Sequence, residues 1–209
     1  THGTQLGDVR AQMLEMLLPQ VQEAYVELAE LEEGQTPIDM SYAPEWRTQG
    51  LARCLSECRN DDVRRGSSTV GPHRDDVDLL INGLAARSHA SQGEQRTLAL
   101  AMRLAVHRLV TEAAGSSPVL ILDDVLSELD PQRSAALLRH FPVGQVLITT
   151  AGLLPAAAHP DRIVHIAAGA IVPDTGAELT QGEVGQHLLG TVLHQEGDVR
   201  GFSDPLAEQ

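Results

Sequence analysis

The chain contains no lysine, and all 15 of its basic residues are arginine. A phosphate-binding loop of the Walker type places a lysine directly after its glycines, where the ammonium group reaches the β- and γ-phosphates of a nucleotide. The 209 residues therefore cannot contain such a loop. Any nucleotide chemistry in this chain must take that cation from polypeptide outside these residues.

Aromatic residues, cysteines and long apolar runs are also scarce. Aromatic side chains make up 2% of the chain, too few for a platform that stacks the bases of a single strand. The two cysteines, Cys54 and Cys58, have no histidine within ten residues, so we expect reduced thiols rather than metal ligands or a disulfide. No run approaches the roughly 18–20 residues of a membrane helix, and we expect no secretion signal, because no charged-then-apolar leader is present. These absences favour a cytoplasmic protein without membrane contact.

The charge is strongly acidic, with a net value of −14. Such a charge argues against a surface that binds nucleic acid over its whole extent. Residues 173–209 are acidic and weakly patterned, and they are interpreted as a flexible tail. If DNA is a partner, local arginine clusters must bind it, and the densest is Arg64, Arg65 and Arg74. The alternative is that these arginines are solvated and pair with the aspartates beside them.

Residues 1–68 have a mainly helical pattern. Apolar residues three and four apart predict one helix over 4–32, with its apolar stripe in the core. Pro19 is expected to kink or split this helix, and Gly34 is expected to end it. A second helix is predicted over 49–62.

From residue 69 the pattern is that of an α/β protein with parallel strands and β-hairpins. Asn82-Gly83 between two apolar runs predicts a hairpin, and a loop to residue 90 precedes a helix over about 92–113. Residues 119–122 predict a strand buried on both faces. Asp130-Pro131 begins a helix, and residues 146–149 form the next strand, which completes a βαβ unit. A closing hairpin is expected over 163–172.

Ser91 begins the first motif that could carry chemistry. Serine followed three residues later by Glu94 is a capping box, and a well-capped helix is one complete interpretation of it. Gly93 in the first turn is a poor helix former, and it also lets a ligand approach the backbone. Free N–H groups, the positive end of the helix dipole and a hydroxyl would then converge on one phosphate. Both interpretations stay open from the residues alone.

Asp123 and Asp124 form the second motif, at the end of the strand over 119–122. In an open parallel sheet, ligands lie beyond the carboxyl ends of the strands. Two adjacent carboxylates repel each other, so a cation is expected nearby. Asp123 would bind Mg²⁺, and Asp124 would orient or deprotonate an attacking water. The alternative is a solvated turn.

Taken together, these segments resemble the ABC-type ATPases, and within them the RecF family. Residues 91–95 are similar to the signature motif, residues 122–124 to Walker B, and residues 127–130 to the D-loop. Residues 71–76 (GPHRDD), followed by residues 81–83, resemble the RecF segment ahead of the signature. The resemblance covers residues 69–152 closely and residues 1–68 more loosely.

This resemblance implies three segments: a helical arm segment over 1–68, the C-terminal half of an ABC-type ATPase lobe over 69–172, and the tail over 173–209. It implies a fragment whose full-length protein is a cytoplasmic ATPase of DNA repair, replication, recombination and the SOS response. That protein would use ATP and Mg²⁺, form a homodimer, bind single-stranded and gapped DNA, and load a recombinase together with recombination mediator proteins. The implied roles are ATP contact in trans for Ser91, Gln92, Gly93, Glu94 and Gln95; Mg²⁺ for Asp123; catalysis for Asp124; the D-loop for Ser127 and Asp130; and the switch for Thr149 or Thr150.

Two other functions remain as alternatives. The chain could be a non-catalytic dimerisation or interaction module of a chromosome-maintenance protein, although adjacent aspartates at a strand exit favour chemistry. It could also be a subunit of a transporter ATPase, which the glutamine-containing signature argues against. In either ATPase, the chain alone is expected to be inactive, because it lacks the phosphate-binding lysine.

Overall fold

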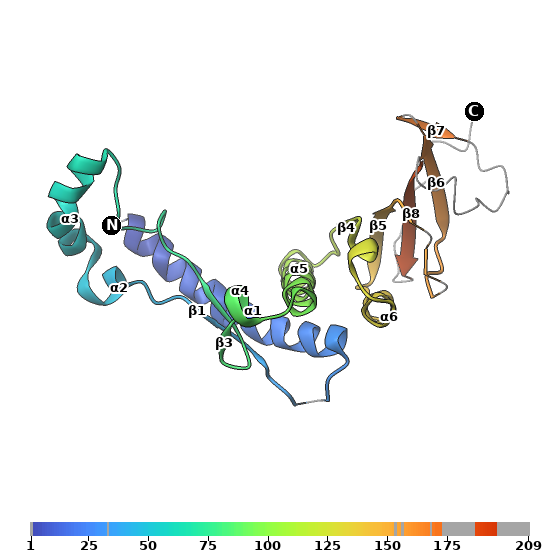
Figure 1. Ribbon diagram of the computed structural model, residues 1–209, viewed down its shortest axis with the longest axis horizontal. Coiled ribbons are helices and arrows are strands. Elements are labelled where there is room, and N and C mark those ends of the chain that lie inside the picture. The colour runs from blue at the N-terminus through green and yellow to red at the C-terminus, as the bar shows by residue number, and fades with distance from the viewer. Residues whose placement is uncertain are drawn as a thin grey trace. The chain divides into compact units, whose positions relative to one another are not determined.

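The computed structural model describes residues 2–32, 34–152, 154–155, 157–167, 169–172 and 187–195. The chain forms two compact units (Figure 1). Unit 1 comprises Thr1–Val26 and Leu31–Ala105, and unit 2 comprises Glu27–Glu30 and Val106–Gln209. The divisions between the units fall after Val26, Glu30 and Ala105, and the three-part division expected above stays a prediction. Among the described residues, every helix is too short or too polar to cross a membrane.

The first helix, α1, spans His2–Ala29 without interruption. Pro19 lies inside it, so of the two predicted outcomes, a kink or a split, the split does not occur. A helix can tolerate one missing backbone hydrogen bond when packing on both sides stabilises it. The helix ends at Ala29 and not at Gly34, and the next residue, Glu30, has a left-handed φ of 51°.

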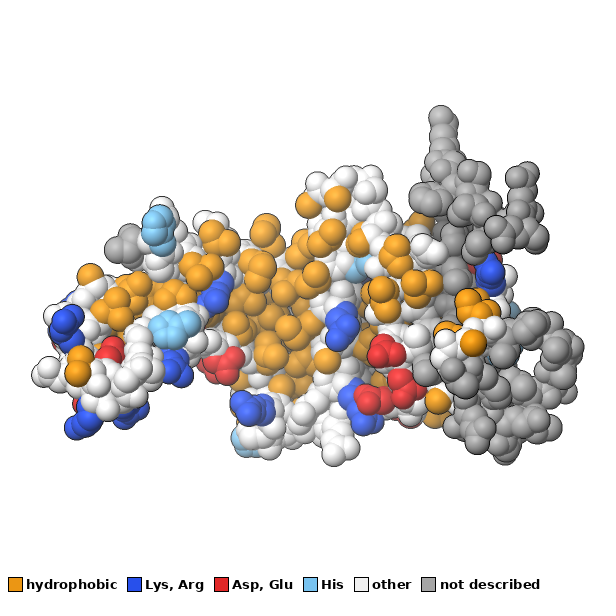
Figure 2. Space-filling view, turned by 90° about the horizontal axis from the view of Figure 1, so that it is seen from above, with side chains coloured by type: hydrophobic (Ala, Val, Ile, Leu, Met, Phe, Trp, Pro, Cys, Tyr) orange, Lys and Arg blue, Asp and Glu red, His pale blue; other side chains and the backbone are white. Residues whose placement is uncertain are grey.

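Burial along α1 changes from one end to the other. Leu17, Val21 and Leu28 are buried, as the apolar stripe predicted. Val9 and Met13 are at least half exposed, so the stripe is not core over its first half. Figure 2 shows hydrophobic side chains gathered in the middle of the view. The spacing of apolar residues correctly predicted which face of the helix is buried. It could not show over what length of the helix other residues cover that face.

Unit 1 contains an antiparallel sheet with strand order β1-β2-β3. The strands are β1 (Ile38–Ser41), β2 (Asp78–Ile81) and β3 (Leu84–Ala85). The turn between β2 and β3 has φ angles of 52° at Asn82 and 77° at Gly83. These are the positive φ values of a two-residue hairpin turn, which confirms the predicted hairpin.

Two helices of unit 1 pack around a tryptophan. They are α2 (Glu45–Gln49) and α3 (Leu51–Arg65). Trp46 packs with Leu51 and Cys54 in a small core, and its indole N–H donates to the Asp75 carboxylate at 2.8 Å. This bond fixes the 71–76 segment against the helices. Both cysteines are free thiols, as predicted.

The long helix α5 spans Gln92–Ala114, close to the predicted bounds. The segment just before it was expected to be a loop. It contains a short helix, α4 (Ala86–His89), instead. Ala86 of this helix is buried, and burial of one small apolar residue is a tertiary effect that local patterning does not reveal.

Unit 2 is built on a sheet with strand order β4-β5-β8-β6-β7. Strands β4 (Leu120–Asp123) and β5 (Gly144–Thr150) are parallel, and α6 (Pro131–Arg139) connects them. This confirms the βαβ prediction. Strands β6 (Arg162–Ala167) and β7 (Ala170–Val172) form the closing hairpin.

One strand of this sheet lies in the segment expected to be a tail. Strand β8 (His187–Gln195) pairs antiparallel with both β5 and β6. The tail interpretation was therefore wrong for these residues, because a strand pairs through its backbone and can form with weak side-chain patterning. Residues 173–186 and 196–209, the rest of the expected tail, lie outside the described residues.

Strand β4 is buried on one face only. Leu120 and Leu122 are buried, whereas Ile121 is 58% exposed. The expectation of burial on both faces was wrong for the described part of the chain. Leu122 and its register partner Ile148 are both buried, whereas Ile121 points to the opposite face of the strand, which is not covered at this position.

The last turn of α1 is anchored within unit 2. Arg108 of α5 donates to the Glu27 carboxylate at 2.6 Å, and the Gln132 amide donates to Glu30 at 2.6 Å. Arg139 also bonds to Glu30. The hydrogen bond from Gln132 is the main cause that lowers the pKa of Glu30. Charged groups of α5 and α6 thus define where this end of α1 lies.

Candidate functional site

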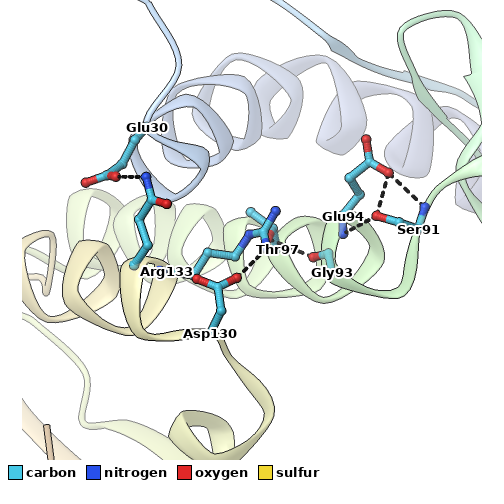
Figure 3. A network of polar contacts seen from close by, with 8 residues as sticks. Glu30, Ser91, Gly93, Glu94, Thr97, Asp130 and Arg133 are labelled. Atoms are coloured by element: carbon cyan, nitrogen blue, oxygen red, sulfur yellow. Dashed lines mark hydrogen bonds and ion pairs between the residues drawn. The ribbon is translucent and has the colours of Figure 1, made fainter.

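The start of α5 forms the capping box that its sequence predicted. The Ser91 N–H and the Ser91 hydroxyl both donate to Glu94 Oε2 at 2.7 Å, and the Glu94 N–H donates to Ser91 Oγ at 3.2 Å (Figure 3). Gln95 reaches back and donates to the Ala90 carbonyl at 3.0 Å. The N–H groups of Ser91 and Glu94 thus find their acceptors within the first turn of the helix.

The same helix start is accessible to a ligand. Ser91, Gln92 and Gln95 are exposed, and Gly93 is half-buried. One carboxylate oxygen of Glu94 occupies the position in front of the serine hydroxyl and its N–H. A phosphate oxygen prefers the same donors, so a nucleotide phosphate would compete with Glu94 for them. Capping and phosphate contact are therefore alternative uses of one set of groups.

Asp123 and Asp124 lie together at the exit of β4, and both side chains are exposed. Asp124 has left-handed backbone angles, φ 51° and ψ 22°. Its N–H donates to the Thr149 carbonyl at 3.0 Å and to Thr149 Oγ1 at 3.1 Å. The Thr149 hydroxyl in turn donates to the Asp123 carboxylate. The ends of two neighbouring parallel strands thus support the acidic pair.

This geometry suits a hard cation in the way the sequence indicated. Mg²⁺ commonly takes one or two protein carboxylates and completes its coordination with water and substrate phosphates. Asp123 and Asp124 present such oxygen ligands at an open edge. Within the described ranges, no group of three or more potential metal-binding side chains is present. The residues therefore fit a cation shared with a bound phosphate rather than a closed metal cage.

The segment after the pair leads directly into α6. It forms a short 3-10 helix over Val125–Glu128, and the Ser127 hydroxyl donates to the Asp124 carbonyl at 2.8 Å. Asp130 then caps α6 by accepting the Arg133 N–H at 2.9 Å (Figure 3). That backbone hydrogen bond is the main cause that lowers the pKa of Asp130. The two predicted D-loop residues therefore bracket a turn whose conformation is well restrained.

The two candidate switch threonines have different surroundings. Thr149 lies directly opposite Asp123 in the β4–β5 pairing. Thr150 is 2% exposed, and its hydroxyl accepts the Gly152 N–H at 3.1 Å. Only Thr149 contacts the acidic pair. Residue type alone could not distinguish the two threonines, because the register of the two parallel strands, which places Thr149 opposite Asp123, is set by their pairing in the structure.

The three candidate DNA-binding arginines are exposed residues of unit 1. Arg64 pairs with Asp61 at 2.7 Å, as the alternative interpretation expected. Arg74 donates to the Ser68 carbonyl at 2.9 Å. At the left of Figure 2, where α3 lies, several arginine side chains and fewer acidic side chains are visible on the face shown. The proposed DNA contact stays a prediction.

The contacts that stabilise residues 71–76 (GPHRDD) could not be predicted from the sequence. The Tyr42 hydroxyl donates to Asp75 Oδ2 at 2.5 Å, and Trp46 binds the other oxygen of the same carboxylate. Burial and this hydrogen bond raise the pKa of Tyr42. The partners are about 30 residues apart in the sequence, so local pattern carried no signal for the contact.

Comparisons with known proteins identify the fold class of the chain. No protein-family profile matches the chain. A solved structure of the recombination mediator protein RecF with ATPrS superposes with a TM-score of 0.54 and 32% identity, over 63% of this chain and 37% of that one. With its parallel strands, helices and helical N-terminal segment, the chain has the ABC-ATPase-like fold of that protein.

Curated relatives narrow the class to one family. The chain is 38% identical to the DNA replication and repair protein RecF of Thermosynechococcus vestitus, over 85% of this chain and 50% of the relative. It is 39% identical to RecF of Rippkaea orientalis, over 65% of this chain and 37% of the relative. The chain belongs to the RecF family. It spans about half or less of the length of the curated relatives that it matches.

Proposed function

We propose that this chain supplies the signature motif, the Walker B strand and the D-loop of a RecF-like ATPase of DNA replication and repair. The observation that carries the proposal is the exit of β4, where two exposed carboxylates lie at the carboxyl ends of parallel strands. The similarity to solved structures of RecF with ATP and with ATPrS supports ATP as the nucleotide. The chain has no lysine, so the phosphate-binding loop belongs to polypeptide outside these residues.

The proposed roles are supported by the position of each residue and by the resemblance to RecF. Asp123 offers carboxylate oxygens to Mg²⁺, which would neutralise charge on the phosphates of ATP. Asp124 orients the attacking water and accepts its proton. The Ser91 hydroxyl and the N–H groups of the α5 start contact the phosphates of ATP bound by another subunit. Ser127 and Asp130 shape the D-loop at the seam of a homodimer.

The first test separates this chain from the full-length ATPase. The purified chain is expected to bind ATP weakly and to hydrolyse none, because no ammonium group reaches the β- and γ-phosphates. Calorimetric titration and a steady-state phosphate-release assay measure the two quantities. Steady-state hydrolysis by the chain alone, abolished by Asp124→Asn, would contradict the proposed division of the site.

The second test uses the full-length protein. Asp124→Asn is expected to abolish ATP turnover while ATP still binds, because the amide keeps the shape but cannot accept a proton. Asp39→Asn, an exposed aspartate on β1, is the matched control and should leave turnover unchanged. Unchanged turnover in Asp124→Asn would instead favour a non-catalytic interaction module.

The wider role of the full-length protein is also a proposal. It would be a cytoplasmic protein that binds single-stranded and gapped DNA and helps recombination mediator proteins load a recombinase. The family similarity supports this role, and the exposed arginines of unit 1 supply candidate phosphate contacts. If Arg65 and Arg74 each contact one phosphate, replacing both should reduce the slope of log affinity against log salt by roughly two units. Arg53→Gln, which removes an arginine paired with Glu57, is the control, and an unchanged slope in the double variant would rule these contacts out.

A further inference from the structure

Thr149 lies where the two parallel strands of unit 2 end side by side. In the β4–β5 register it is the direct partner of Asp123. Because the carboxyl ends of parallel strands share one edge of a sheet, a side chain at this position can reach the residues that follow the neighbouring strand. Thr149 does so with both its backbone and its side chain.

The single hydroxyl of Thr149 acts as donor and acceptor at once. It donates to Oδ1 of Asp123 and accepts the Asp124 N–H at 3.1 Å. The Thr149 carbonyl accepts the same N–H at 3.0 Å. One residue therefore restrains the carboxylate of the first aspartate and the backbone of the second.

These restraints act on a backbone conformation that is otherwise unfavourable. A left-handed conformation is unfavourable for an ordinary residue, because its Cβ approaches the following carbonyl oxygen, although aspartate tolerates it better than most. Such a conformation persists when its surroundings over-determine it. For Asp124, the N–H is accepted by Thr149, and the carbonyl accepts the Ser127 hydroxyl at 2.8 Å. Thr149 thus contributes directly to the direction in which the Asp124 side chain leaves the strand.

We propose that Thr149 is a positioning residue that orients Asp123 and Asp124 for nucleotide hydrolysis, and not a residue that meets the terminal phosphate. The inference rests on the proposed function. The Thr149 hydroxyl bonds to one oxygen of the Asp123 carboxylate, and the second oxygen can still bind a hard cation. Thr150, which bonds to Gly152 in the following turn, has no part in this arrangement.

The test compares two substitutions of Thr149 by NMR in this chain. Thr149→Val keeps the β-branched shape and removes the hydroxyl, whereas Thr149→Ser keeps the hydroxyl. In Thr149→Val we expect loss of the single Asp123 side-chain rotamer and an upfield shift of the Asp124 amide proton, since one of its two acceptors is gone. Thr149→Ser should restore both signals.

Thr150→Val is the matched control, because it removes a neighbouring hydroxyl that bonds elsewhere. It should leave the signals of Asp123 and Asp124 unchanged. The proposal is overturned if Thr149→Val leaves both signals as they are, if serine fails to restore them, or if Thr150→Val changes them equally. If a variant fails to fold, the hydrogen bond of Thr149 can be tested in the unaltered chain. A slowly exchanging Thr149 hydroxyl proton close to the Asp124 amide supports the proposal, and rapid exchange of that proton contradicts it.

The full-length protein separates this inference from the proposed function. If both are correct, Thr149→Val lowers ATP turnover about tenfold, the effect of losing one hydrogen bond to a charged group, and Thr149→Ser does not. If the NMR signals respond as expected but the unaltered full-length protein hydrolyses no ATP, the positioning role stands and the proposed ATPase function fails.

Discussion

The start of α5 and the exit of β4 reach a defined geometry by different means. At the helix start, Ser91 and Glu94 satisfy each other across three residues of one turn. At the strand exit, Asp123 and Asp124 depend on Thr149, which is 25 or 26 residues away in the sequence. The first is a local structure, and the second exists only because two strands pair.

The difference also concerns stability. The capping box uses residues that are among the best choices for that position in a helix. The strand exit contains two adjacent acids and a left-handed aspartate, which a stability optimum would not select. Departures from local preference of this kind are expected at functional sites. The comparison therefore assigns the stronger functional signal to the strand exit.

The largest expected effect tests whether the strand exit depends on the core of unit 2. Leu122 is fully buried directly before Asp123. Leu122→Ala should lower the free energy of unfolding by about 2–5 kcal/mol, through lost burial and the cavity that remains. Urea unfolding measures this change, and the NMR signals of Asp123 should shift while those of Ser91 do not.

Ile121→Ala is the matched control on the same strand. Because Ile121 is 58% exposed, its truncation should change the free energy of unfolding by no more than about 0.5 kcal/mol. Equal costs for the two substitutions would show that both faces of β4 are buried, against the structure.

The next effect tests the local nature of the helix start. Ser91→Ala should lower the free energy of unfolding by about 1 kcal/mol, because the Glu94 N–H loses its capping acceptor. Amide exchange in the first turn of α5 should accelerate, and the Asp124 amide should not change. Ser88→Ala, at a nearby exposed serine, should have little effect, and a change at Asp124 would mean that the two sites are not independent.

A smaller effect of opposite sign tests whether the strand exit stores strain. Asp124→Gly should raise the free energy of unfolding by about 0.5–1 kcal/mol, because glycine adopts positive φ without steric cost. Asp123→Gly, in the extended backbone of β4, should lower it by a similar amount. Thermal unfolding of both variants measures the two changes in the free energy of unfolding. Destabilisation by Asp124→Gly would mean that the aspartate side chain stabilises the turn.

The smallest expected effect concerns Asp130, a local cap that follows the strand exit. Hydrogen bonding by the Arg133 N–H lowers the pKa of Asp130 from its ordinary value of 3.8. Its contribution to stability is therefore complete above that value and is lost as the pH falls through the lower pKa of the folded state. Carboxyl NMR titration between about pH 5 and pH 2 should show this loss. Asp130→Asn, which still caps α6, should remove this pH dependence of stability. An Asp130 carboxyl that titrates at its ordinary pKa would contradict the prediction.

Prediction from sequence succeeded where the determinants lie close together in the chain. The hairpin at Asn82-Gly83, the α6 cap at Asp130 and the capping box at Ser91 each follow from a few adjacent residues, and each was found. The predictions that were wrong depend on distant packing. These include the exposed Val9 and Met13 in the first half of α1, the exposed face of β4 and strand β8.

The sequence by itself determined the local chemistry: the absence of lysine, the capped helix start, the acidic pair after an apolar strand and the resemblance to the RecF family. These depend on residue identity and short spacing, which the chain carries directly. Only the tertiary structure decided that Thr149 rather than Thr150 reaches the acidic pair and that Asp75 joins Tyr42 and Trp46. The physical reason is that such contacts form between segments brought together by strand pairing and burial, and their sequence separation leaves no periodic or local signal.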